Sequence, residues 1–247
     1  MKRIWFVLLF FAFYGVVPAQ KLTLQKYIQL KTNQLHYASQ YGDVEAYKNT
    51  LYDLIAAQPE NIAWKDSLAT LYFQTGMYPQ VLALTGELLK KDPQNEKYLM
   101  MQVQAFEALG RLKKAIAILE NLTAKHPQDA ILHYRLAWDQ YNLKRSEEAY
   151  NTLMAIKDAT FPDTKVSLPA GPKQWQAVPL KAAYYNLLGL TAYDLHNLDL
   201  AVQYFDQALK EYPDFVSAKQ NKAAMELMKA KLAAPAGTKD KSAKTKK

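Results

Sequence analysis

Residues 62–129 read IAWKDSLATLYFQTGMYPQVLALTGELLKKDPQN and then EKYLMMQVQAFEALGRLKKAIAILENLTAKHPQD, two segments of equal length with a glycine and a proline at the same positions. Gly76 recurs as Gly110 and Pro93 recurs as Pro127, at one and the same spacing. A fixed spacing of about 34 residues is typical of a solenoid whose repeating unit is a pair of helices joined by a turn. The stretch therefore predicts a repeat protein.

Local residue types support helix pairs within each segment. Apolar residues come three and four apart, as at Leu68, Leu71 and Tyr72, which predicts amphipathic helices. Gly76 can adopt the left-handed conformation that ends a first helix. Pro93 then ends the second helix, because it lacks an amide donor and disfavours helix in the residue before it.

The same period continues outside the quoted stretch. One period upstream stand Gly42 and Pro59, and one period downstream of Ala115 stands Ala149. A small residue at this step lets the two helices of a pair approach closely. We expect a bulky polar replacement there to separate them.

Three units place the same kinds of residue at the same steps. They are Leu68, Ala69, Tyr72, Gly76, Tyr78, Val81, Leu88 and Pro93, then Val103, Phe106, Gly110, Ala115, Leu119, Leu122 and Pro127, and later Tyr185, Leu188, Gly189, Ala201, Phe205, Ala208 and Pro213. Over residues 23–231 the chain resembles the tetratricopeptide repeat family. The resemblance implies an all-α fold, an α-solenoid of antiparallel helix pairs wound as a right-handed superhelix. It leaves the function open.

The repeat period, the prolines and the changes in composition divide the chain into seven segments. We expect a signal peptide at 1–19, a degenerate N-terminal repeat at 20–61, three repeats at 62–162, a proline-rich insertion loop at 163–181, a further repeat at 182–215, a capping helix at 216–232 and a disordered lysine-rich tail at 233–247. Terminal repeats commonly depart from the pattern, because one of their faces has no neighbour.

The first segment has the features of a secretory signal. Lys2 and Arg3 precede a run, residues 4–17, that is apolar or aromatic apart from Gly15. Small residues before Gln20 predict cleavage after Ala19 and export to the periplasm or cell envelope. An uncleaved anchor is the alternative, although a bilayer span takes about 20 apolar residues. The chain has no cysteine, which excludes disulfides, thiol nucleophiles and lipid attachment at a cysteine.

The insertion interrupts the period after the third repeat. The distance from Pro127 to Pro213 is longer than two periods by roughly half a period, and the distance from Ala149 to Ala201 shows the same excess over one period. The extra residues are rich in proline and cannot form a regular helix. Two readings remain open for Trp175, the anchor of a protruding binding loop or a side chain that packs back on a neighbouring helix.

The positive charge is concentrated at the two ends. The formal net charge is +8; the predicted signal carries two of these charges and residues 231–247 a net five, which leaves about +1 for residues 20–230. Nucleic-acid binding by the repeats is therefore unsupported. The tail either contacts an anionic lipid or polymer or serves solubility alone.

No pattern of catalytic or cofactor-binding residues stands out. The histidines do not form a zinc-binding motif, and neither a phosphate-binding glycine loop nor a nucleophile elbow is present. His126, Asp129 and His133 are separated by Pro127, and Asp129 is better explained as a helix N-cap. We expect no enzyme activity, no metal and no cofactor.

The resemblance implies that the first helix of each unit lines a concave face that binds a protein or peptide partner. On this sequence the implied residues are Phe73, Gln74, Met100, Gln104, Glu107, Tyr134, Trp138, Tyr141, Asn142, Asn186, Tyr193 and Asp194. Some of these aromatic residues could instead pack between units. The lysine and asparagine that some members use to bind a C-terminal carboxylate are replaced by Asp66 and Thr70, which argues against that mode.

These features favour a non-catalytic protein–protein interaction scaffold in the cell envelope. The alternative is a surface tether whose lysine-rich tail makes the contact while the repeats act as a spacer. Self-association through the repeat faces is a third possibility. The oligomeric state does not follow from the sequence.

Overall fold

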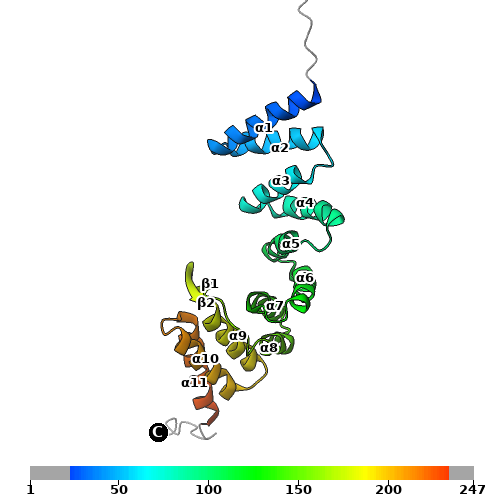
Figure 1. Cartoon of the computed structure of the whole chain (residues 1–247). Helices are drawn as coiled ribbons and strands as arrows, with labels where there is room; N and C mark the ends of the chain where they lie inside the picture. Colours follow the sequence, from blue (N-terminus) through cyan, green and yellow to red (C-terminus); the bar gives the residue numbers. More distant parts are fainter. Residues whose placement is uncertain (1–22, 234–247) are drawn as a thin grey trace, which may run out of the picture. The chain divides into compact units, whose positions relative to one another are not determined.

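A computed structural model describes residues 23–233, in which eleven helices and one β-hairpin follow each other along the chain. Figure 1 shows the helices as consecutive antiparallel pairs, so the predicted all-α solenoid is confirmed. The elements are α1 Leu24–Gln40, α2 Val44–Ala57, α3 Ile62–Gln74, α4 Tyr78–Lys91, α5 Glu96–Ala108, α6 Leu112–Lys125, α7 Ala130–Asn142, α8 Ser146–Met154, β1 Lys165–Gly171, β2 Gln174–Pro179, α9 Leu180–Asp194, α10 Leu198–Glu211 and α11 Val216–Ala233. The predicted signal peptide and nearly all of the predicted tail lie outside the described residues.

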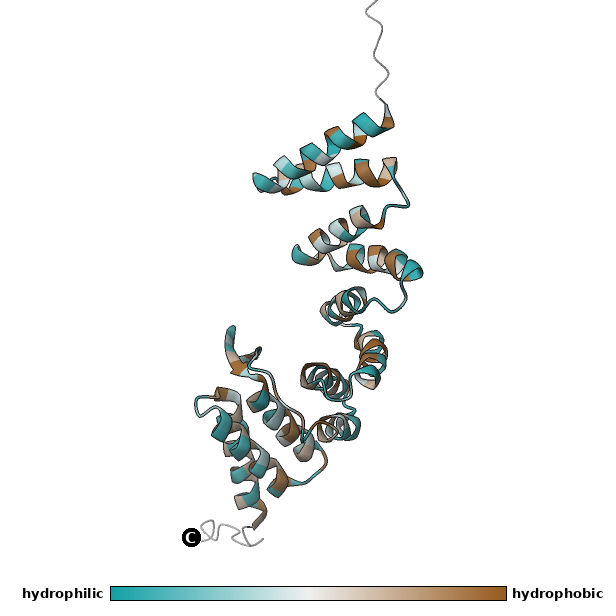
Figure 2. Cartoon of the chain, in the orientation of Figure 1, coloured by the Kyte–Doolittle hydropathy of each residue, from teal (hydrophilic) through white to brown (hydrophobic). Residues whose placement is uncertain are grey.

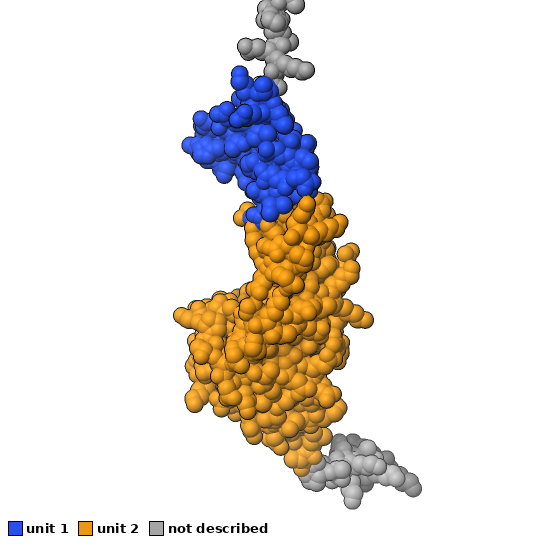
Figure 3. Space-filling model, turned by 45° about the vertical axis from the view of Figure 1, so that its right-hand side comes forward, with its two compact units in different colours: residues 1–71 blue, residues 72–247 orange. Residues whose placement is uncertain are grey.

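The chain divides into two compact units, residues 1–71 and 72–247, drawn in blue and orange in Figure 3. The boundary lies inside α3. In the first unit α1 packs on α2 and buries Leu51 and Leu54, and Lys31 pairs with Asp53 at 2.6 Å. In the second unit each helix from α4 to α11 packs against the next. No helix of the described residues is long and apolar enough to span a membrane.

Five turns between paired helices have the same backbone geometry. At the turn after α5, the amide of Gly110 donates to the Glu107 carbonyl at 2.9 Å and the amide of Arg111 donates to the Phe106 carbonyl at 2.7 Å. These are the two hydrogen bonds of a Schellman motif, which needs one left-handed residue. That residue has φ of 68°, 70°, 68°, 61° and 62° at Gly42, Gly76, Gly110, Lys144 and His196.

His196 occupies a left-handed position that suits glycine better. We expect His196→Gly to raise the free energy of unfolding by about 0.5 to 1 kcal/mol, because the strain on a Cβ-bearing residue exceeds the entropy that glycine loses on folding. Gly110→Ala, at the equivalent turn, should lower it by about 1 kcal/mol. Urea denaturation followed by circular dichroism measures both. An unchanged or lower stability of His196→Gly would contradict this account of the turns.

The helices pack through apolar faces and small residues. Hydrophobic and hydrophilic residues alternate around most helices (Figure 2). Ala115, Ala149 and Ala201 have no exposed surface, as expected for a step that brings two helices close together. Larger side chains fill the core of the last repeat, where Tyr184, Phe205 and Phe215 are buried.

The predicted insertion loop is a β-hairpin. Strand β1 pairs antiparallel with β2, and Lys165 opposes Pro179 while Pro169 opposes Trp175. One face of the hairpin buries Leu168 and Val178 in the core that α7, α8 and α9 share. The sequence excluded a regular helix here and left the conformation of the insertion open. Its prolines are compatible with strands, because prolines are tolerated at strand ends and edges.

Helix α11 lies where the sequence predicts a capping helix. It packs on α10, and Lys222 pairs with Asp206 of that helix at 2.6 Å. Its first turn also meets the hairpin, because the Ser217 hydroxyl donates to the Pro169 carbonyl at 2.6 Å. The hairpin is therefore held at its base by α9 and near its tip by α11.

Candidate functional site

A groove of about 1280 Å³ opens between the first helices of two repeats and the hairpin, entirely within the second unit. Its walls come from α5, α7 and β1, with single contributions from neighbouring helices and from β2. The lining residues are Tyr78, Gln104, Glu107, Leu112, Ile131, Tyr134, Arg135, Trp138, Asp139, Asn142, Thr164, Lys165, Val166, Ser167, Leu168, Pro169, Trp175 and Leu180.

Helix α7 supplies the aromatic side of the groove. Its start is fixed by Asp129, whose carboxylate accepts hydrogen bonds from the amides of Ile131 and Leu132 at 2.9 and 3.0 Å, so the predicted N-cap is confirmed. One turn apart on the helix, Tyr134 and Trp138 stack with ring centroids 6.3 Å apart. Trp138 is half-buried and presents the rest of its ring to the groove.

Charged residues of α7 and α5 also line the groove. The Arg135 guanidinium donates to both carboxylate oxygens of Glu107 on α5, at 2.6 and 2.5 Å. Asp139, one turn further along α7, is only 2% exposed. Burial raises the pKa of Asp139 to about 7. The negative charge of Glu107 and a hydrogen bond of the protonated Asp139 carboxyl with the Glu107 side chain add to the rise, and the positive charge of Arg135 opposes it.

The raised pKa of Asp139 predicts a pH-dependent stability. Its folded value of about 7 lies above the ordinary value of 3.8, so between these pH values the folded chain binds more protons than the unfolded chain. The stability that Asp139 contributes is therefore lost as the pH rises through this window. We expect Asp139→Asn to stabilise the chain more at pH 8 than at pH 5, as measured by urea denaturation. An equal effect at both pH values would contradict the assigned pKa.

The hairpin forms the opposite wall. Six consecutive residues, 164–169, line the groove, with Leu168 buried against the core. Trp175 on β2 lines it too, and its side chain is 68% exposed. Of the two readings of this tryptophan, the structure agrees with a protruding side chain and not with one packed on a neighbouring helix.

Comparisons with known proteins identify the repeats. Family models described as "Tetratricopeptide repeat" match residues 67–130, 107–167 and 182–215. Together these matches cover more than half of the chain. The chain belongs to the tetratricopeptide repeat family. This family consists of repeat scaffolds for protein–protein interaction. In a separate comparison, no curated protein matches the chain.

Solved structures of tetratricopeptide repeat proteins share the fold. A crystal structure of YrrB, described as a TPR protein with an unusual peptide-binding site, has a TM-score of 0.61 at 15% identity and covers 81% of this chain and 98% of its own. A crystal structure of MamA has a TM-score of 0.58 at 15% identity, and the match covers 87% of this chain and 100% of that chain. A structure of MamA from Desulfovibrio magneticus RS-1 has a TM-score of 0.58 at 14% identity, and the match covers 78% of this chain and 99% of that chain. At these identities the likeness concerns the fold alone.

Some of the residues implied by the tetratricopeptide pattern meet in the groove. These are Gln104, Glu107, Tyr134, Trp138 and Asn142, joined by Trp175 from the insertion. Phe73, Gln74 and Met100 do not line it, and Met100 packs against the core between α5 and α6.

The remaining implied residues are held by other contacts. Tyr141 packs against the core near Trp138, and Tyr193 packs against the cluster around Phe205. Buried Asn186 accepts a hydrogen bond from the Asn221 amide of α11 at 3.0 Å, and Asp194 accepts one from the Ser146 hydroxyl at 2.6 Å. The last repeat therefore contributes little to the groove.

Sequence reasoning missed Asp139, Arg135 and the wall formed by residues 164–169. Asp139 follows Leu132 and Leu136 on the same helix stripe, at steps of seven and three residues. An acidic residue on the apolar stripe of a helix is a signal that could have marked it.

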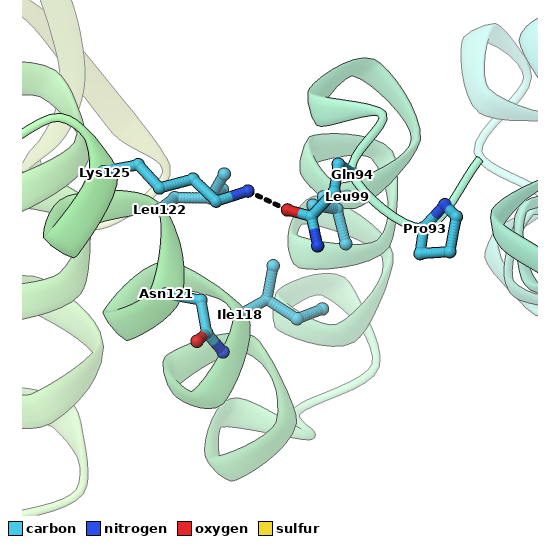
Figure 4. A pocket seen from close by; sticks show the side chains of 7 residues that line it. All are labelled: Pro93, Gln94, Leu99, Ile118, Asn121, Leu122 and Lys125. Carbon is cyan, nitrogen blue, oxygen red and sulfur yellow. Dashed lines mark hydrogen bonds between the residues drawn. The ribbon is translucent and has the colours of Figure 1, made fainter.

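A smaller cavity of about 260 Å³ lies between α5 and α6 (Figure 4). Pro93, Leu99 and Ile118 line it, and the Lys125 ammonium donates to the Gln94 side chain across it. Nearby, His126 Nε2 forms a hydrogen bond with the Glu96 carboxylate at 2.8 Å, and His133 Nδ1 forms one with the backbone carbonyl of Asp129 at 2.9 Å. Among the described residues no group of three histidine or acidic side chains is placed to hold a metal ion.

Proposed function

We propose that this tetratricopeptide repeat protein is a scaffold of the cell envelope that binds an extended segment of a partner protein in the groove between α5, α7 and the hairpin. One observation carries the proposal. A groove of about 1280 Å³ combines the aromatic side chains of Trp138 and Trp175 with the amides of Gln104 and Asn142. Aromatic side chains supply buried area, and amides can pair with the backbone of a peptide.

The shape of the walls favours an extended segment. Strand β1 forms one side of the groove, and the consecutive residues 164–169 all line it. Apart from β2, no strand of the described residues pairs with β1. A peptide lying along this wall would place alternate side chains against α7.

Export is part of the proposal and rests on the sequence. The basic start at Lys2 and Arg3, the apolar run and the small residues before Gln20 are typical of a secretory signal. N-terminal sequencing of the protein isolated from cells tests it. A mature chain that begins at Gln20 would support export, and one that keeps residues 1–19 would contradict cleavage.

Selection from a random peptide library tests the binding itself. The chain without residues 1–19 serves as bait, and residues 20–232 serve as a second bait that lacks the lysine-rich tail. We expect both baits to select the same peptides, because the groove belongs to the repeats. Peptides that bind only the longer bait, and that moderate salt removes, would favour the tether over the scaffold.

A further inference from the structure

Two buried polar atoms in the groove lack a hydrogen-bond partner. They are the hydroxyl oxygen of Tyr134 and one carboxylate oxygen, Oδ2, of Asp139. Both residues line the groove and both are more than nine-tenths buried, with exposures of 6% and 2%. Buried polar atoms are nearly always paired in folded proteins, so unpaired atoms on residues that line a groove favour a ligand that supplies the partner.

The charges around Asp139 define the missing partner. Glu107 on α5 is already held by both nitrogens of the Arg135 fork, so the two charges of this pair compensate each other. Asp139 therefore has no cation of its own, and its carboxyl, when protonated, can share a hydrogen bond only with the carboxylate of Glu107. Lys165 of β1 also lines the groove, but its side chain is exposed on the hairpin.

The neighbouring rings suit a long cationic side chain. Tyr134 and Trp138 stack on each other on the same helix, and both line the groove with Asp139. An aromatic face attracts an ammonium or guanidinium group, and the aliphatic part of lysine or arginine covers apolar surface. A metal ion fits less well, because Glu107 is engaged by Arg135 and the described residues offer no third ligand.

We infer that the bound segment of the partner places a lysine or arginine side chain against Asp139, with its stem along Tyr134 and Trp138. The inference rests on the proposed function, since it assumes that the groove binds a peptide. It goes further by defining the chemistry of one position in that peptide.

The lysine-rich tail of the chain itself is a weaker occupant. Residues 234–247 contain lysine, alanine, threonine and other small residues, and none of them has a large apolar side chain. The groove wall includes Trp138, Trp175 and Leu168, which a partner segment with apolar residues beside its basic residue would cover. We therefore assign the groove to a partner protein.

Proton linkage gives a second readout. Asp139 is charged mainly above its pKa of about 7, and a cation bound there favours the charged form. Among the charged and titratable groups that line the groove, Glu107 on α5 and Arg135 on α7 act on Asp139, and the others are Tyr78 on α4, Tyr134 on α7 and Lys165 on β1. Binding of a basic peptide should thus tighten between pH 6 and pH 8.

The experiment uses peptides selected on the chain without residues 1–19. We expect the selected peptides to be enriched in lysine or arginine at one position. Replacing that residue by methionine, which keeps length without charge, should weaken binding to the unmodified chain by about tenfold or more. The same replacement should have little effect on binding to Asp139→Asn. Asp199→Asn, which removes an exposed carboxylate of α10 outside the groove, is the matched control.

The outcomes separate the inference from the proposed function. Peptides that need Trp138 but show no basic preference, and that bind Asp139→Asn unchanged, would overturn the inference and leave the groove in place. Selection of no peptide, or of peptides indifferent to Trp138→Ala, would overturn the proposed function. A tenfold gain in peptide affinity on removal of residues 233–247 would overturn the assignment to a partner, since the tail would then be a competing occupant.

Discussion

Gly189→Ala should lower the free energy of unfolding by about 2 to 3 kcal/mol, because the added methyl group would overlap a buried ring. A Cβ atom on Gly189 of α9 would lie 2.6 Å from Cδ1 and 2.8 Å from Cζ of Phe205 on α10. Phe205 has no exposed surface, so its ring has little space to move. Urea denaturation followed by circular dichroism measures the loss.

Two further variants test the cause of that loss. Gly86→Ala is the control, since Gly86 also lies within a helix but has open space around its Cβ position, and alanine there should stabilise by about 0.5 to 1 kcal/mol. Adding Phe205→Leu to Gly189→Ala should cost less than the sum of the two single changes by about 1 kcal/mol. Strict additivity would show that the overlap is not the cause.

Trp138→Ala should weaken binding of a selected peptide by about 2 kcal/mol or more, the size found for aromatic residues at the centre of an interface. Trp138 is half-buried, lines the groove and stacks with Tyr134. Isothermal titration calorimetry measures the affinity. Circular dichroism should show the helical content intact, because the core residues around Trp138 remain in place.

Trp64→Ala provides the matched control. Trp64 is also half-buried on a helix, but it belongs to the first unit, where its indole nitrogen donates to Gln58 at 3.1 Å. We expect it to leave peptide affinity unchanged. An equal loss of affinity in both variants would mean that Trp138 acts through the stability of the chain and does not contact the peptide.

The repeat architecture could be predicted because short-range chemistry specifies it. Gly42, Gly76 and Gly110 mark turns that need a left-handed residue, and the structure has the same turn at Lys144 and His196, where the sequence carries no glycine. The repeat period located these turns even where the residue type did not. The position of Asp129 just before a predicted helix likewise allowed it to be predicted as a helix N-cap.

The groove was only partly predictable. Gln104, Trp138 and Asn142 follow from the repeat pattern, because that pattern sets which side of a first helix faces inward. The hairpin wall did not follow, since its pairing depends on a register between Lys165–Pro169 and Trp175–Pro179 that prolines obscured. The partners of Asn186 and Asp194 come from α11 and α8, and such contacts between elements leave no local trace in sequence.

The most direct test of peptide binding in the groove is an amide NMR spectrum of the chain without residues 1–19, recorded with and without a selected peptide. We predict that the largest shift changes fall on α5, on α7 around Trp138 and Asp139, and on residues 164–169 of the hairpin wall. Changes confined to α1 and α2, or to the lysine-rich tail, would contradict the groove as the binding surface.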